Sequence, residues 1–471
     1  MEANQYAELY NSQKKYFINV LKKERLYARK ERLLKIKKWV KNNQVLIQDT
    51  LYKDFQKTPE EVLISEIKPI IGEINLALKK LRSWNKDRRV SAPLTLLGTK
   101  GKIKIEPKGV CLVVAPWNFP FMLAVGPIIS AIAAGNTVVL KPSEMTPHTE
   151  KLLVKLFTDL FPKENIAVVT GGIPETTELL KLPWNHIFFT GSPQVGKIVM
   201  KQAAEHLTSV TLELGGRNPV VITKNANLRD TAKKLAWGKF FNNGQSCVSP
   251  NYVLIDKEIK DKFIEELKFE FVDMYGNYPE EIKQNKALTR VVNDFHFNRL
   301  KTLLDNSLKS GAEVVFGNTT DEKTNYISPT ILTNVKVDNP IFKEEIFGPI
   351  LPLIEYSNLE EALNIIRKVD APLAFYVFSK SKKEQTHIIN NTSAGTTVIN
   401  DTTLQFAHPN LPFGGVGSSG MGKAHGHYGF LEFSNQRSVL TQRTNGTTSQ
   451  FIYPKYNWFN RLIIKIITWN E

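Results

Sequence analysis

The sequence contains very little cysteine and no long apolar run. Two of its 471 residues are cysteines, Cys111 and Cys247, which excludes a disulfide scaffold and a cysteine-rich zinc site. No apolar run reaches the roughly 18 residues that a membrane-spanning helix needs. Residues 1–11 are polar and lack the apolar core of a secretory signal peptide, so we expect a cytoplasmic protein. A functional cysteine in this chain would act alone.

Acidic residues are scarce relative to basic ones. The chain has 46 Asp and Glu residues against 62 Lys and Arg residues, which gives a net charge of +16. Between Lys22 and Lys41 the spacing of basic and apolar residues predicts an amphipathic helix with a basic outer face. We expect a plain surface helix here, with attraction to nucleic acid, acidic lipid or a phosphorylated cofactor as the alternative. Because no zinc-finger spacing and no RNA-binding aromatic signature accompany the charge, we expect no nucleic-acid partner.

The first half of the chain alternates strand and helix patterns. Apolar runs predict strands at 109–115, 137–140, 166–170, 186–190 and 209–214. Helical patterns separate them at 121–134, 147–160, 174–181 and 194–206. This alternation predicts an α/β fold with a parallel sheet that is covered on both faces and binds ligands at the carboxyl ends of its strands.

A second alternating series predicts a second α/β domain. Its strands are expected at 219–222, 350–355, 374–379 and 396–399. Its helices are expected at 227–242, 257–273, 287–309 and 358–368. The segment 401–429, rich in Gly, Pro and His, is long enough to be a functional loop.

Two glycine-rich motifs differ in their context. Gly191 and Gly196 bracket a turn that nearly matches a phosphate-binding P-loop, but Ile198 stands where that loop needs Ser or Thr to hold magnesium. The turn, including Ser192, is therefore either a simple strand-to-helix connection or a pyrophosphate site at a helix N-terminus. The segment 415–420 also fits G-x-G-x-x-G, but no strand precedes it, so we expect a loop with close backbone approach.

Polar residues follow three of the predicted strands or helices. Lys141 and Glu144 follow the strand at 137–140 and either bind ribose and phosphate or lie in a solvated loop. Cys247 follows a polar stretch that suits a reactive thiolate, whereas Cys111 lies in an apolar strand and is expected to be an inert core residue. No family signature marks a histidine partner for the thiol. Glu213 ends an apolar strand, where burial would raise its pKa toward that of a general base.

Seven co-linear motifs resemble the aldehyde dehydrogenase superfamily over about residues 105–440. They are Pro116–Pro120, Lys141–Glu144, Phe189–Ser192, Leu212–Gly216, Gly244–Cys247, Glu344–Pro349 and Leu411–Gly415. The loop 415–422 and the tail resemble the class 3, fatty-aldehyde-related branch. The resemblance implies a Rossmann-like cofactor domain, a catalytic α/β domain and a small β oligomerisation arm.

The resemblance also implies catalytic roles. The thiolate of Cys247 would attack the aldehyde carbon, and the side chain of Asn118 would stabilise the resulting oxyanion together with the Cys247 N–H. Hydride transfer to nicotinamide would leave a thioester, and Glu213 would activate the water that hydrolyses it.

Binding roles follow from the same resemblance. NAD or NADP would contact Trp117, Lys141, Glu144, Gly191, Ser192, Gly196, Glu345 and Phe347. Trp117, Phe119, Met122, Trp237 and Phe241 are candidate walls of an apolar aldehyde tunnel, with core packing as the alternative. Asn251 stands where relatives often have an acidic residue.

The family organisation divides the chain into five parts. They are a cofactor domain (1–87 and 107–213), a catalytic domain (214–417), an arm (88–106 and 434–446), a return segment (418–433) and a tail (447–471). Residues 88–106 are expected to form an edge strand with 436–442 as its partner, and the arm would pair across a homodimer because a free edge aggregates. The pattern at 457–469 predicts an amphipathic helix that packs on the dimer near the substrate mouth, lies on a membrane surface, or does neither.

Two functions remain open at this point. The first is NAD(P)-dependent oxidation of a medium-chain, long-chain or aromatic aldehyde to its carboxylic acid. The second is a repurposed relative, either esterase-like or thioesterase-like or a membrane-associated scaffold, that has no redox turnover.

Overall fold

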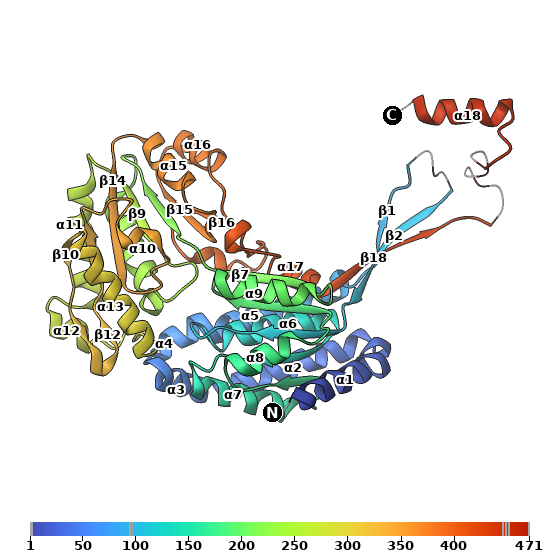
Figure 1. Cartoon of the computed structure of the whole chain (residues 1–471), viewed down its shortest axis with the longest axis horizontal. Helices are drawn as coiled ribbons and strands as arrows, with labels where there is room; N and C mark the ends of the chain where they lie inside the picture. The colour runs from blue at the N-terminus through green and yellow to red at the C-terminus, as the bar shows by residue number, and fades with distance from the viewer. Residues whose placement is uncertain are drawn as a thin grey trace.

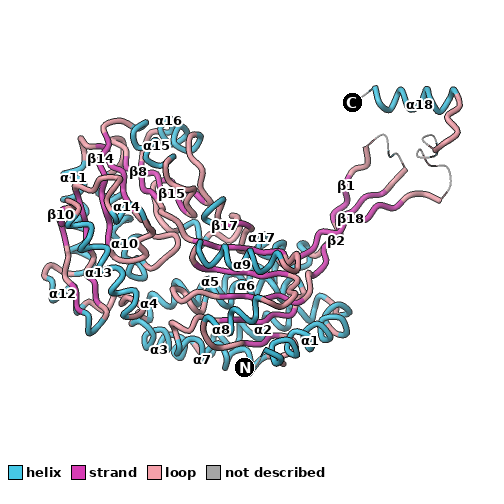
Figure 2. The backbone as a smooth tube through the Cα atoms, viewed as in Figure 1, coloured by secondary structure: helices cyan, strands magenta, loops and turns pink. Residues whose placement is uncertain are grey.

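The computed structural model describes residues 3–93, 96, 98–444, 447, 450 and 453–469. Two α/β lobes lie side by side, and a thin β arm projects from one of them toward the C-terminal helix (Figure 1). The tube view shows β2 (Lys100–Pro107) and β18 (Ser434–Thr441) running side by side away from the body of the chain, with β1 (Arg88–Val90) beside them (Figure 2). Among the helices in the described ranges, none has the length and apolarity that a bilayer span requires.

The first lobe contains a six-stranded sheet with the order β17-β7-β6-β3-β4-β5. Its strands are β3 (Val110–Val114), β4 (Thr137–Lys141), β5 (Ile166–Val168), β6 (His186–Gly191), β7 (Ser209–Leu214) and β17 (Gly420–Met421). The first five are parallel, and β17 runs antiparallel to β7. The parallel sheet confirms the prediction. The short β17, which the sequence pattern did not predict, extends the sheet next to Glu213.

Helices cover both faces of this sheet. One face carries α2 (Leu26–Asn42), α5 (Lys68–Trp84), α6 (Met122–Ala134), α7 (Pro147–Leu160) and α17 (Gly426–Glu432). The other carries α1 (Ala3–Asn19), α8 (Ile173–Leu180) and α9 (Pro193–Ala204). The polar helix α1 was not predicted. It is held by buried Tyr6 and by Gln13, whose amide donates to the carbonyls of Val138 and Lys163, both at 2.9 Å.

The second lobe contains a seven-stranded sheet with the order β10-β13-β14-β9-β8-β15-β16. Its strands are β8 (Pro219–Ile222), β9 (Tyr252–Asp256), β10 (Glu313–Phe316), β13 (Thr330–Thr333), β14 (Ile350–Tyr356), β15 (Ala374–Phe378) and β16 (Thr396–Ile399). Its main helices are α10 (Leu228–Phe240), α11 (Lys260–Tyr275), α13 (Asp294–Lys309), α15 (Leu359–Arg367) and α16 (Lys382–Asn390). The second α/β unit is therefore confirmed, with β9, β10 and β13 as additional strands.

Two predicted helices have different ends in the structure. The helix expected at 287–309 begins at Asp294, because the side chain of Asn293 caps it by accepting from the His296 N–H at 3.0 Å. The helix expected at 227–242 ends at Phe240. Asn242 and Asn243 have φ values of 53° and 55°, which lie in the left-handed region and cannot continue the helix.

The arm is a three-stranded antiparallel sheet of β1 (Arg88–Val90), β2 (Lys100–Pro107) and β18 (Ser434–Thr441). The prediction of one edge strand over 88–106 was wrong. The chain turns back after Val90, so β1 pairs with one side of β2 while β18 pairs with the other. The segment 102–106 therefore lies in the central strand, and β1 and β18 carry the free edges.

The glycines of the loop before β17 allow its tight path along β7. Gly420 pairs with Glu213 at a φ of 134°, and a Cβ there would lie 2.0 Å from the Leu212 carbonyl oxygen. A Cβ on Gly415 would lie 2.0 Å from the carbonyl oxygen of Ser419. The expectation of a loop with close backbone approach is confirmed.

We predict that Gly420→Ala lowers the free energy of unfolding by at least about 2 kcal/mol, because the new Cβ collides with a backbone oxygen at a positive φ. Gly417→Ala is the matched control, since Gly417 has a φ of 62° and open space around its Cβ position. Its cost should be about 1 kcal/mol. Thermal unfolding of both variants checks this, and equal losses would contradict the assigned contact.

Candidate active site

Cys247 lies in a loop that is clamped to the second lobe. The side-chain amide of Asn218 donates to the carbonyls of Cys247 at 2.8 Å and Ser249 at 2.9 Å. Its oxygen accepts from the N–H of Ala374 at 2.9 Å, at the start of β15. One buried amide therefore sets the path of the main chain on both sides of the thiol.

The surroundings of the thiol favour its protonated form. Burial, together with the nearby carboxylates of Glu345 and Glu213, raises the pKa of Cys247 to about 12. Cys247 is half-buried and lines a cavity, whereas Cys111 is fully buried in β3. The expectation that Cys111 is a core residue is confirmed.

Glu213, from the other lobe, reaches a second, smaller cavity that Cys247 also lines. It lies near the end of β7, is 6% exposed, and lines that cavity together with the thiol. Neither carboxylate oxygen has a hydrogen-bond partner within the described part of the chain. Burial therefore raises the pKa of Glu213 well above its ordinary value, although the Lys423 ammonium partly opposes the shift.

Asn118 joins the two lobes at the thiol loop. It lies between β3 and α6, and its side-chain nitrogen donates to the Gln245 carbonyl at 3.1 Å. A carboxamide nitrogen carries two hydrogens. The bond to Gln245 therefore leaves one N–H of Asn118 available to an acceptor beside the cysteine.

The polar residues predicted to contact a cofactor lie along the carboxyl ends of the first sheet. Lys141 ends β4, is 1% exposed, and forms an ion pair with Glu144 at 3.6 Å. Burial lowers the pKa of its ammonium. Gly191 ends β6, and Ser192 caps α9 by accepting from the Val195 N–H at 3.3 Å. A buried cation at the end of a strand and the positive dipole end of a helix suit a dinucleotide with its phosphates.

The glycines of this turn also have packing roles. A Cβ on Gly196 would lie 2.8 Å from a methyl carbon of Leu214. A Cβ on Gly191 would lie 2.5 Å from the ring of Phe189. The lack of side chains thus lets α9 approach the sheet closely, which places the start of the helix at the sheet edge.

Glu345 and Phe347 approach this edge from the second lobe. Glu345 Oε1 has no hydrogen-bond partner within the described residues, and burial raises the pKa of this carboxyl to about 7. Phe347 has a φ of 49°, and its ring packs edge-on against Trp117 with centroids 5.3 Å apart. A carboxylate with one unpaired buried oxygen beside the strand ends fits a ligand with hydroxyl donors such as ribose.

Four of the five candidate tunnel residues line one apolar cavity with the thiol. It measures about 470 Å³, and Phe119, Met122, Trp237 and Phe241 contribute to its wall beside Cys247. Phe241 packs against Trp237 at 5.2 Å and against Phe119 at 6.2 Å between ring centroids. Trp117 lies outside this wall and packs instead between Phe347 and His296.

One group at the cavity was missed by the sequence reasoning. His425 donates from Nδ1 to Glu73 Oε1 at 3.0 Å, and it lines both the apolar cavity and the smaller one shared by Cys247 and Glu213. Its ring lies edge-on to Phe406 and Phe413 at 4.6 and 5.2 Å. The histidines of the long loop 401–429 were the only sequence signal for this group. The contact with Glu73 could not be predicted, because the two residues are 352 positions apart in the chain.

Asn251 explains one departure from the family pattern. Its amide nitrogen donates to the Glu344 carbonyl at 3.2 Å, and its oxygen accepts from the Ile346 N–H at 2.8 Å. A carboxylate could make only the second of these bonds. The Asn251 amide therefore fixes the main chain at the residue before Glu345 and at the residue after it.

Comparisons with known proteins agree with this geometry. The model of the aldehyde dehydrogenase family matches residues 2–439. A relative from Staphylococcus aureus, 4,4'-diaponeurosporen-aldehyde dehydrogenase, is 42% identical over 91% of this chain and 92% of its own length. The dimeric NADP-preferring aldehyde dehydrogenase of Rattus norvegicus is 42% identical over 88% of this chain and 90% of its own length. Aldehyde dehydrogenase family 3 member A2 of Mus musculus is 39% identical over 93% and 90%.

Solved structures show the same fold. The substrate-bound state of Staphylococcus aureus AldH matches with a TM-score of 0.93 and 39% identity, covering 98% of this chain and 99% of that one. Mycobacterium tuberculosis aldehyde dehydrogenase complexed with NAD+ matches with a TM-score of 0.84 and 26% identity, covering 94% and 91%.

The chain belongs to the aldehyde dehydrogenase family, so it is an oxidoreductase that oxidises aldehydes with NAD or NADP. Its relatives include family 3 members, which confirms the resemblance to the class 3, fatty-aldehyde-related branch. These comparisons support the first of the two functions left open by the sequence and not the repurposed relative.

We predict that Glu345→Gln speeds alkylation of Cys247 by iodoacetamide severalfold at pH 8. The substitution removes a negative charge that raises the pKa of the thiol, so the reactive thiolate becomes more abundant. The rate is measured from the mass of the peptide that contains Cys247. A slower reaction would contradict the assigned electrostatics.

Proposed function

We propose that each lobe supplies one catalytic group for aldehyde oxidation. The second lobe supplies Cys247 and the first supplies Glu213, at the cavity that both residues line. The observation that carries this proposal is that a thiol from one lobe and an unpaired buried carboxylate from the other line one cavity. Both groups have raised pKa values, and the raised pKa of Glu213 makes its carboxylate a stronger base that can take a proton from water.

The reaction then takes two steps at Cys247. The Cys247 thiol releases its proton to solvent, its sulfur bonds to the carbonyl carbon, and the new oxyanion accepts from Asn118 and from the Cys247 N–H. Bound NAD or NADP supplies the hydride acceptor, and the carbon is left as a thioester. Glu213 then takes a proton from water as its oxygen attacks the thioester, and the carboxylic acid departs as the carbon–sulfur bond breaks.

The binding residues are assigned by position. The cofactor would lie across the strand ends, with Lys141 and Glu144 at the adenosine ribose and Glu345 at the nicotinamide ribose. Gly191, Ser192 and Gly196 would lie at the pyrophosphate, and Phe347 beside the nicotinamide ring against Trp117.

The apolar cavity supports a medium-chain, long-chain or aromatic aldehyde as the substrate. Its volume of about 470 Å³ lies in the range of cavities that enclose small organic ligands. The aromatic wall would bind an apolar chain and leave the aldehyde carbon at the thiol. The name of the Staphylococcus aureus relative, which refers to 4,4'-diaponeurosporen-aldehyde, is in keeping with an apolar substrate.

We further propose the five-part division of the chain and a cytoplasmic homodimer joined through the arm. The free edges of β1 and β18 can each pair with a second copy. The helix α18 (Trp458–Trp469) exposes Trp458, Phe459, Leu462 and Ile466. It would cover this face either on the partner near the substrate mouth or on a membrane surface.

We predict that Cys247→Ala abolishes aldehyde oxidation and retains NAD binding. Glu213→Gln should give a burst of NADH followed by slow turnover, because acylation proceeds and deacylation loses its base. Stopped-flow absorbance at 340 nm with decanal measures both. Unchanged steady turnover in Glu213→Gln would contradict its role.

We predict that removing residues 447–471 shifts the chain-length preference across hexanal, decanal and hexadecanal, or abolishes cosedimentation with anionic phospholipid vesicles. The full chain with Trp458 and Phe459 both changed to Ser is the point-variant comparison, since it alters the exposed face but keeps the tail. If neither property changes, the proposed role of the tail is wrong.

A further inference from the structure

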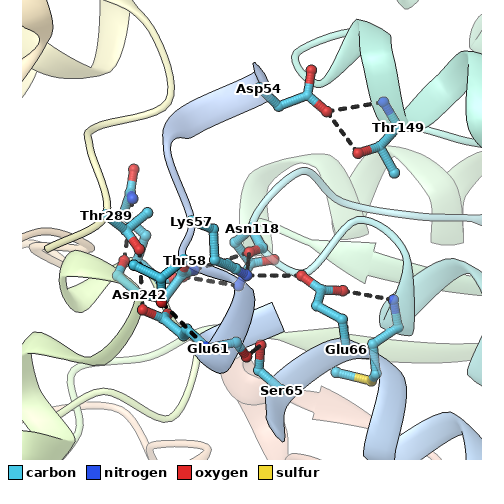
Figure 3. Close-up of polar contacts among 12 residues, drawn as sticks. Asp54, Lys57, Thr58, Glu61, Ser65, Glu66, Asn118, Thr149, Asn242 and Thr289 are labelled. Carbon is cyan, nitrogen blue, oxygen red and sulfur yellow. Dashed lines mark hydrogen bonds and ion pairs between the residues drawn. The ribbon is translucent and has the colours of Figure 1, made fainter. Parts of the chain in front are cut away.

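A buried ion pair lies behind the loop that carries Asn118. The Nζ atom of Lys57 and Oε1 of Glu66 are 2.7 Å apart, and both side chains are 0% exposed (Figure 3). Lys57 precedes the short helix α4 (Pro59–Val62), and Glu66 lies in the π-helical turn Leu63–Ile67. Neither residue belongs to a motif that the family resemblance singled out.

Both members of the pair bind the loop between β3 and α6. Lys57 Nζ also donates to the Asn118 carbonyl at 3.2 Å, and its charge lies 4.2 Å from the centre of the Phe119 ring. Glu66 Oε2 accepts from the N–H of Met122 at 2.8 Å. The pair therefore holds the segment that supplies one oxyanion donor and two walls of the apolar cavity.

A second support ties the same carbonyl to the thiol loop. The side-chain nitrogen of Asn242 donates to the carbonyls of Asn118 and Gln245, both at 2.9 Å (Figure 3). Asn118 itself donates from its side chain to the Gln245 carbonyl at 3.1 Å. Hydrogen bonds thus tie both the main chain and the side chain of Asn118 to the loop that holds Cys247.

Stability alone does not explain a charged pair at this place. Taking two charges out of water costs several kcal/mol each, and a well-packed apolar pair is often as stable or more so. The ion pair adds directional hydrogen bonds, because each charged group donates or accepts in a set geometry and so fixes the position of the loop. That geometry matters here, since a displacement of about 1 Å at a catalytic group can cost 10²-fold in rate.

We propose that Lys57 and Glu66 are positioning residues that hold the amide of Asn118 where the oxyanion forms. The proposal rests on the catalytic roles of Cys247 and Asn118 given under the proposed function. Lys57 acts on the main chain of Asn118, and Glu66 acts on Lys57 and on the far end of the same loop at Met122.

The test uses three reactions of the same thiol. Aldehyde oxidation passes through an oxyanion on the carbon bonded to Cys247. So does the hydrolysis of p-nitrophenyl acetate, in which the thiolate displaces p-nitrophenolate and water then releases acetate. Alkylation by iodoacetamide displaces iodide and forms no oxyanion. A positioning defect should slow the first two reactions and spare the third.

Lys57→Met keeps the length of the side chain and removes its charge and donors. We expect kcat for decanal oxidation and for ester hydrolysis to fall about tenfold to 10²-fold, with unchanged alkylation rate and unchanged NAD affinity. In an Asn118→Ala background, Lys57→Met should cause no further fall, because it acts through the group already removed. Effects that multiply, or equal slowing of all three reactions, would overturn the proposal.

Two further variants keep the result interpretable. Asp54→Ala removes a carboxylate on the same segment that accepts from Thr149 at 2.6 and 2.9 Å, and it should lower the unfolding temperature while kcat stays unchanged (Figure 3). Glu66→Gln serves if Lys57→Met does not fold. A carboxamide has one oxygen and cannot accept from both Lys57 and Met122, so the same kinetic pattern is expected.

The Asn118→Ala variant separates the catalytic role of Asn118 from the positioning role of Lys57 and Glu66. If Asn118→Ala leaves both oxyanion reactions unchanged, the proposed role of Asn118 is wrong and the positioning proposal falls with it. If Asn118→Ala slows them by about 10²–10³ and Lys57→Met does not, only the positioning proposal is wrong.

Discussion

The burial of ionisable groups between the two lobes governs the chemistry of this protein. Cys247 and Glu213 come from different lobes and line one cavity. Burial penalises the charged form of each, so the pKa values of the thiol and of the carboxyl both rise. The same burial that keeps the thiol protonated makes the carboxylate a stronger base.

Such a site needs support from groups that do not react. An unpartnered carboxylate is costly in an apolar run, and the structure offsets the cost with a rigid frame. Asn218 clamps the thiol loop, Asn251 holds the segment of Glu345, and Gly420 lets β17 pass beside Glu213. The buried pair of Lys57 and Glu66 completes this frame behind Asn118. These supports come from both lobes, so the relative placement of the lobes is part of the active site.

The sequence predicted what depends on local patterns. Apolar runs located the parallel strands, and polar residues after them located Lys141, Glu213 and Gly191 at one edge. The motif order then identified the family. Patterns could not predict contacts between residues far apart in the chain, such as Glu73 with His425 or Lys57 with Asn118. Nor could an alternating segment reveal that 102–106 becomes a central strand, because that depends on how the chain turns back after Val90.

The covalent intermediate tests the central claim most directly. Enzyme quenched with acid during turnover of decanal and NAD should carry a decanoyl group on the peptide that contains Cys247, seen by mass spectrometry. The account predicts that this acylated fraction increases when Glu213 is changed to Gln. An unmodified Cys247 during active turnover, or an acyl group on a different residue, would contradict it.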